Sequence, residues 1–138
     1  MGLMGDYKNK LLDAAFGTGD PVTVYLGISN TPADWDGTNF TEPTATEYAR
    51  LAITNNRTNF PVAVAGIMSN GVDFDFPMTE EAWGTIYDFA FFVSAGCAPT
   101  PANMLGIGSL ITPKVLAIGA HPTFSAGDLK ILCDPSVV

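Results

Sequence analysis

The chain has 138 residues, the size of one ordinary domain, and 47% of them are hydrophobic while only 14% are charged. This charged fraction is well below the roughly 25% of an average soluble protein, so much of the surface must carry neutral side chains. Fourteen acids against six bases give a formal net charge of −8, which repels a phosphate backbone. We therefore expect no nucleic-acid binding, and a surface that packs against neighbouring subunits is favoured.

Targeting and redox signals in the sequence are sparse. No basic segment precedes an apolar one at the N-terminus, and no run of about 18 uncharged apolar residues occurs. We therefore expect neither a secretory signal nor a membrane span. The two cysteines, Cys97 and Cys133, lack zinc-ligand spacing. Cys133 alternates with Leu129 and Ile131, which is typical of a buried thiol in a strand, and a bridge to Cys97 is the alternative.

Residues 6–16 are the best helix candidate. Asp6 can cap the helix, Tyr7 and Leu11 recur at helical spacing, and a glycine follows the segment. Beyond it, Gly, Pro and Asn recur too often for long helices. We therefore expect an N-terminal helical arm over residues 1–19.

The rest of the chain, residues 20–138, is typical of short strands. The clearest alternation is in residues 72–76, where Val72, Phe74 and Phe76 alternate with two aspartates. A period of two places the apolar side chains on one sheet face and the aspartates in water. Further strand candidates are residues 22–29, 47–54, 60–68, 85–93, 104–112, 115–118 and 129–133.

Two features of these candidates predict how the strands are arranged. An Asn70-Gly71 turn joins residues 60–68 to residues 72–76, which predicts a hairpin. Residues 85–93 are nearly all apolar, as expected of a central strand that is covered on both faces. About eight short strands with frequent turns therefore predict a single all-β domain, a jelly-roll-like β-sandwich preceded by one short helix.

The sequence offers no catalytic constellation, and we predict no cofactor and no metal. His121 is the only histidine and lies in a turn sequence, which indicates an exposed imidazole rather than a triad member. Asp73 and Asp75 project from one strand face and are expected to be solvated, with calcium binding or acid–base catalysis as the alternative. The glycine-rich segments lack the Lys-Ser/Thr of a phosphate-binding loop. We expect a protein that is not an enzyme.

A long connection over residues 30–44 is the most suggestive surface segment. It carries Trp35 between Asp34 and Asp36, and such a ring can stack on a carbohydrate or protein partner or fold back onto its own core. Loops of this length in small domains often contact a partner. Together with the N-terminal helix, this loop supplies the candidate interaction residues Tyr7, Leu11, Asp34, Trp35, Asp36 and Phe40.

Short motifs follow one another in a characteristic order along nearly the whole chain. They are Asp6 to Asp13, Val24 to Ser29 followed by Thr31-Pro32, Thr41-Glu42-Pro43, Tyr48-Ala49-Arg50, Asn59-Phe60-Pro61, Ser69-Asn70-Gly71, Phe76-Pro77, Trp83 to Ile86, Gly106 to Lys114, and Phe124 to Leu129. In this order they resemble a family of small tailed-bacteriophage virion proteins, commonly labelled phage tail fibre proteins. The chain departs from the family's pattern at residues 94–103, where Gly96-Cys97-Ala98-Pro99-Thr100-Pro101 replaces a Gly-rich hairpin turn.

The resemblance implies a non-enzymatic part of a virus particle, assembled in the bacterial cytoplasm. The leading hypothesis is a capsid decoration protein, a cement that binds the major capsid protein or other virion proteins as a homotrimer. It is favoured by the single-domain length, the low charge and the absence of a stalk repeat. The alternative is a tail or head fibre adhesin that contacts host-surface glycan through Trp35 and the acids beside it.

Overall fold

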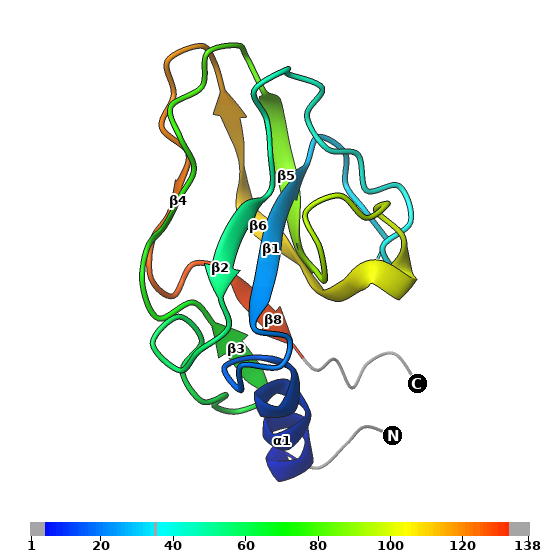
Figure 1. The fold of residues 1–138 in the computed structure, drawn as a ribbon, viewed down its shortest axis with the longest axis vertical. Helices are drawn as coiled ribbons and strands as arrows, with labels where there is room; N and C mark the ends of the chain where they lie inside the picture. Colours follow the sequence, from blue (N-terminus) through cyan, green and yellow to red (C-terminus); the bar gives the residue numbers. More distant parts are fainter. Residues whose placement is uncertain (1–4, 35, 133–138) are drawn as a thin grey trace.

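The computed structural model describes residues 5–34 and 36–132 (Figure 1). In this part of the chain one α-helix precedes eight strands and one short 3-10 helix, so the prediction of an all-β fold with an N-terminal helix is confirmed. The elements are α1 (Gly5–Ala15), β1 (Thr23–Ser29), β2 (Leu51–Thr54), β3 (Ile67–Ser69), β4 (Phe74–Asp75), β5 (Gly84–Phe92), η1 (Pro101–Asn103), β6 (Met104–Leu116), β7 (Thr123–Phe124) and β8 (Lys130–Leu132).

The strands form one four-stranded antiparallel sheet and two short ladders. The sheet has the order β2-β1-β5-β6, while β3 pairs with β8 and β4 pairs with β7. The ladders lie against one face of the sheet, and α1 lies at the lower end of the molecule beside β3 (Figure 1). The result is a sandwich-like arrangement of two layers, while the jelly-roll topology stays a prediction.

The main core fills the space between the sheet and the ladders. Phe16 at the end of α1, Phe60 and Phe91 of β5 form a ring cluster with centroid distances of 5.3, 5.6 and 5.4 Å. Such tilted and edge-to-face contacts add to the free energy gained by burying the rings. Ladder residues complete this core, among them Met68, Phe74, Phe124 and Ile131.

A second, smaller core lies on the other face of the sheet. Phe40 from the long connection packs against Phe92, with ring centroids 5.6 Å apart, and Ala90 lies beside them. Strand β5 therefore has buried side chains on both faces and a strand neighbour on each edge. This confirms the prediction that residues 85–93 contain the central strand.

The predicted hairpin of residues 60–68 and 72–76 is wrong. β3 and β4 do not pair with each other but with β8 and β7, which lie more than 45 residues further along the chain. The buried Asn70 side chain accounts for the difference, because besides the nearby Val72 carbonyl it bonds to the backbone of residues 124–129 and so ties this turn to the chain between β7 and β8. β7 has no counterpart among the predicted strands.

Residues 104–112 and 115–118 were predicted as two strands but belong to one long strand, β6, with an irregularity. The pair Ile86–Lys114 and the pair Asp88–Ser109 enclose only Tyr87 on β5 but four residues, 110–113, on β6. Extra residues on one strand of a pair push the chain outward and bend it. Pro113 lies in this bulge, where its missing N–H removes no ladder hydrogen bond.

Candidate functional site

The candidate interaction residues lie at two separate places. Leu11 is 52% exposed on α1, whereas the ring of Phe40 is buried in the second core. The side chain of Tyr7 and the whole of Trp35 lie outside the described residues. Asp34 and Asp36 are exposed in the long connection.

The carboxylates of Asp34 and Asp36 accept hydrogen bonds from residues of their own loop. Asp34 Oδ2 accepts hydrogen bonds from Thr38 Oγ1 at 2.8 Å and from Asn39 Nδ2 at 3.2 Å. Asp36 Oδ1 accepts from the Thr38 N–H at 3.0 Å and from Thr38 Oγ1 at 2.8 Å, and these bonds lower the pKa of Asp36. Both acids are therefore already engaged within the loop, which fixes its shape.

A buried ion pair holds this connection on the sheet. Arg50 donates from Nε to Glu42 Oε1 at 2.8 Å and from Nη2 to Glu42 Oε2 at 2.9 Å, and its side chain is only 4% exposed. The guanidinium lies 3.6 Å from the centroid of the Phe92 ring. Two-point pairing and ring stacking suit an arginine and not a lysine. We call this ion pair the Arg50–Glu42 clamp. Sequence reasoning missed it, because nothing in the spacing of Glu42 and Arg50 indicates a contact.

The clamp extends to a tyrosine and a cysteine. Tyr48 donates from its hydroxyl to Glu42 Oε1 at 2.9 Å and accepts from the Ile28 N–H at 3.2 Å. Desolvation, reinforced by the charge of Glu42, raises the pKa of Tyr48. Arg50 Nη1 also donates to the Ser94 carbonyl at 3.0 Å and to Sγ of Cys97 at 3.3 Å.

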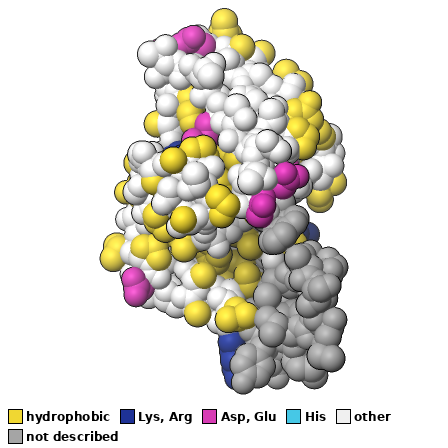
Figure 2. Space-filling model, turned by 90° about the vertical axis from the view of Figure 1, so that its right-hand side faces the viewer, with side chains coloured by type: hydrophobic (Ala, Val, Ile, Leu, Met, Phe, Trp, Pro, Cys, Tyr) yellow, Lys and Arg dark blue, Asp and Glu magenta, His cyan; other side chains and the backbone are white. Residues whose placement is uncertain are grey.

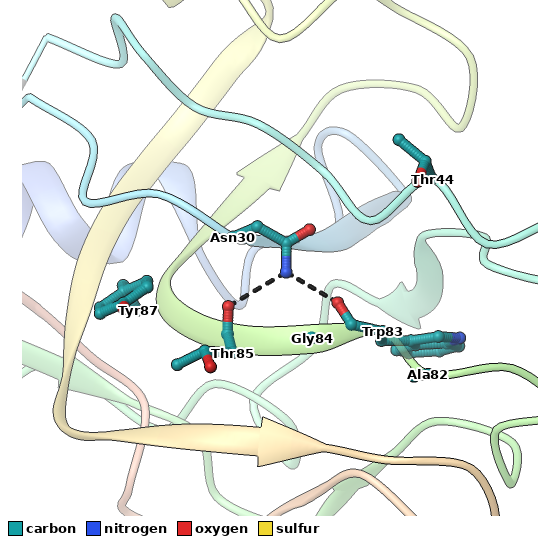
Figure 3. Close-up of a pocket in the computed structure, with 7 residues that line it drawn as sticks. All are labelled: Asn30, Thr44, Ala82, Trp83, Gly84, Thr85 and Tyr87. Atoms are coloured by element: carbon teal, nitrogen blue, oxygen red, sulfur yellow. Dashed lines mark hydrogen bonds between the residues drawn. The ribbon is translucent and has the colours of Figure 1, made fainter.

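A pocket of about 490 Å³ lies between the two ends of the long connection and the beginning of β5. Its wall includes Asn30, Thr44, Thr85 and Tyr87, and none of its lining residues is charged (Figure 3). Asn30 is fixed there because its Nδ2 donates to the carbonyl of Trp83 at 2.7 Å and to that of Thr85 at 3.0 Å. No sequence motif indicates this pocket, because its residues come from three separate segments.

The residues considered as candidates for catalysis or metal binding do not form a common site. His121 is exposed in the loop before β7, as predicted. Asp73 and Asp75 are exposed, and Asp73 Oδ1 accepts from the Ala126 N–H at 2.9 Å. Among the described residues no three His, Cys, Asp or Glu side chains are grouped to hold a metal ion. Cys97 carries a free thiol, while Cys133 lies outside the described residues.

Large hydrophobic side chains are exposed at both ends of the molecule. Near α1 the exposed residues include Leu11, Val62 and Val64, and Asp13 Oδ1 accepts from the Ala63 N–H at 2.7 Å, which places this segment beside the helix. Around the second half of β6 they are Met78, Ile111, Val115 and Ile118. Figure 2 shows one face of the molecule, on which hydrophobic side chains are widely spread and acidic and basic side chains are sparse. Within the described residues no helix is long and apolar enough to span a bilayer.

Comparison with known proteins identifies the chain's relatives. Residues 4–132 match the family model described as podophage GP4 fiber I protein gp80. A search of curated proteins finds no match. The matched segment includes every helix and strand of the structure, so the predicted relation to tailed-phage virion proteins is confirmed. This chain belongs to the podophage GP4 fiber I protein gp80 family and is a fibre-type phage virion protein.

Proposed function

We propose that this protein is a non-enzymatic structural subunit of a podophage fibre, which packs against neighbouring virion subunits through uncharged surface. The observation that carries the proposal is the match of residues 4–132 to a fibre protein family. The fold supports a passive role, because the partly buried side chain of Glu42 and the buried side chains of Arg50 and Asp88 are engaged in holding the structure together.

The charge distribution supports packing against neighbours. No charged residue occurs between Asp88 and Lys114, a segment that includes the last four residues of β5, most of β6 and the loop between them. A protein with a net charge of −8 repels a second copy of itself over most of its surface. Close packing is least opposed where charge is absent and apolar side chains are exposed, as they are at Ile111 and Val115.

Head decoration is the second proposal. It is favoured by the shape of the chain, because the described residues contain one 11-residue helix and strands of 2 to 13 residues but no elongated stalk. A cement protein that binds the major capsid protein would use the same neutral surface. In either position we propose a homotrimer as the assembled form.

Localisation on the virion separates the two positions. The experiment is cryo-electron microscopy of intact particles, with antibody against the purified chain as an independent label. Density and label on fibres alone would support the fibre role. Density over the head lattice, with none on fibres, would discard it in favour of decoration, and absence from the particle would overturn both.

A further inference from the structure

The pocket beside Asn30 has chemistry that the structural role does not require. Four of its lining residues carry side-chain oxygens: Asn30 with Oδ1, and Thr44, Thr85 and Tyr87 with hydroxyl groups (Figure 3). None of these four oxygens makes a hydrogen bond with the described residues, although the amide nitrogen of Asn30 makes two. These oxygens are therefore available to a ligand.

The pocket is also held in a fixed shape. Asn30 is anchored by its amide and by its backbone N–H, which donates to the Thr41 carbonyl at 2.7 Å. Gly84 has φ +83°, and a Cβ at this position would lie 3.1 Å from Nδ2 of Asn30, so a glycine permits the close approach. Trp83 is buried and donates from Nε1 to Glu47 at 2.8 Å. A preformed site of this kind loses little conformational freedom on binding.

We infer that this pocket binds a neutral saccharide of one or two sugar rings. Asn30 Oδ1 can only accept a hydrogen bond, while the three hydroxyl groups both donate and accept, and sugar hydroxyls match both kinds of partner. The ring of Tyr87 offers a flat apolar face to the C–H side of a sugar. The hollow of about 490 Å³ is open to solvent, so a sugar would contact it along one side only.

The absence of charged residues in the pocket argues against ionised ligands. An ionised ligand would lose hydration without gaining a counter-charge, because no lining residue is charged. An anionic sugar would also approach a protein whose net charge is −8. The pocket is separate from the Asp34–Asp36 loop, whose carboxylates are occupied by Thr38 and Asn39.

The inference deepens the proposed fibre role by naming a ligand class, and it is tested on the purified chain. Saturation-transfer NMR and titration would use D-glucose, D-galactose, N-acetyl-D-glucosamine and their disaccharides, with D-glucuronate as the charged comparison. We expect at least one neutral sugar to bind with a dissociation constant on the order of 1 mM, as shallow sites give. D-glucuronate should bind at least tenfold more weakly.

Two variants assign the binding to this pocket. Tyr87→Ala removes the ring and should raise the dissociation constant about tenfold. Thr44→Val removes one exposed hydroxyl and should raise it about threefold. Thr54→Val changes an exposed threonine on β2 outside the pocket and should leave it unchanged. Thermal unfolding of each variant identifies any that do not fold. If Tyr87→Ala does not fold, Thr44→Val still tests the inference, because Thr44 is exposed.

Three results would overturn the inference. They are no binding by any neutral sugar, glucuronate binding as tightly as the neutral sugars, and binding that the pocket variants leave unchanged. None of these outcomes bears on whether the protein lies on the fibre or the head, because the virion experiment is independent of sugar.

Discussion

Asn70 shows how one side chain can organise a distant part of the fold. Its amide nitrogen donates to the carbonyls of Val72, Phe124 and Ser125 at 2.9, 3.2 and 3.0 Å. Its Oδ1 accepts from the N–H groups of Gly127 and Leu129 at 3.1 and 3.0 Å. With only 3% of its surface exposed, Asn70 replaces the water that these backbone groups would otherwise need.

Asn70→Ala should lower the free energy of unfolding by about 2–4 kcal/mol, because several buried backbone groups lose their partner at once. The measurement is urea unfolding followed by tryptophan fluorescence. The matched control is Asn56→Ala, where Asn56 is exposed and accepts one bond from the Asn59 N–H at 2.9 Å, so its cost should stay below about 1 kcal/mol. Equal costs for both variants would show that Asn70 is not the organising residue.

Glu47 couples the stability of the fold to pH. Its Oε1 accepts from the N–H groups of Glu81 and Glu80 at 2.9 and 3.0 Å and from Trp83 Nε1 at 2.8 Å. The Glu81 backbone bond is the main cause that lowers the pKa of Glu47 from 4.5 to about 2. A carboxyl whose pKa is lower in the folded state stabilises the fold above its unfolded pKa and loses that effect as pH falls.

The difference in stability between the native protein and Glu47→Gln should therefore be constant above about pH 5.5 and shrink as pH falls from 4.5 towards 2. Chemical unfolding of both proteins at a series of pH values measures this. A residual difference should persist in acid, because Oε2 is shielded from solvent and has no partner among the described residues, so an amide there would bury an unpaired donor. A difference that does not change with pH would contradict the lowered pKa of Glu47.

At the scale of elements, two glycines of β6 set how closely β8 packs on the sheet. A Cβ at Gly108 would lie 2.5 Å from the Phe89 ring and 2.7 Å from the backbone oxygen of Lys130. A Cβ at Gly106 would lie 3.0 Å from Cδ1 of Ile131. Glycine at position 108 lets the backbones of β6 and β8 approach closely. A side chain there would meet the carbonyl oxygen of Lys130, which can move only if β8 moves with it.

Gly108→Ala should destabilise the protein by about 1–3 kcal/mol through overpacking. Gly96→Ala is the matched control, since nothing lies within 4 Å of a Cβ at Gly96, and it should leave stability unchanged within about 0.5 kcal/mol. Thermal unfolding of the two variants side by side makes the comparison. If Gly108→Ala were as stable as Gly96→Ala, the β6–β8 contact would be looser than the structure shows.

The same elements show what the sequence could predict. Local patterns identified α1, β1, β4 and the central strand β5, because alternation and helical spacing report which face of a segment is buried. Which strands pair with each other could not be predicted. β3 and β8 would each bury one face against any partner strand, and the pairing that forms depends on hydrogen bonds between Asn70 and residues far along the chain. The Arg50–Glu42 clamp and the Asn30 pocket were missed for the same reason: each joins segments whose contact only the folded chain creates.

At the scale of the whole molecule, net charge and exposed apolar surface oppose each other. The net charge of −8 keeps copies apart, while Ile111, 93% exposed on the bulge of β6, and Val115, 73% exposed, favour contact. Salt screens the repulsion between charges and does not weaken apolar contacts. Self-association of the purified protein, followed by sedimentation, should therefore increase from low to physiological salt.

Ile111→Asp should weaken this self-association at least tenfold, since a buried isoleucine contributes roughly 1.5–3 kcal/mol and each 1.4 kcal/mol is a factor of ten. Thr112→Asp is the matched control, because it adds the same charge at the neighbouring exposed position of the bulge without removing apolar surface. Sedimentation equilibrium of the three proteins at several salt concentrations separates the two effects. If both variants weaken association equally, and salt abolishes the difference from the native protein, then charge alone governs assembly and the bulge of β6 is not the contact. If Ile111→Asp alone weakens association at every salt concentration, the apolar side chain on the bulge holds the copies together.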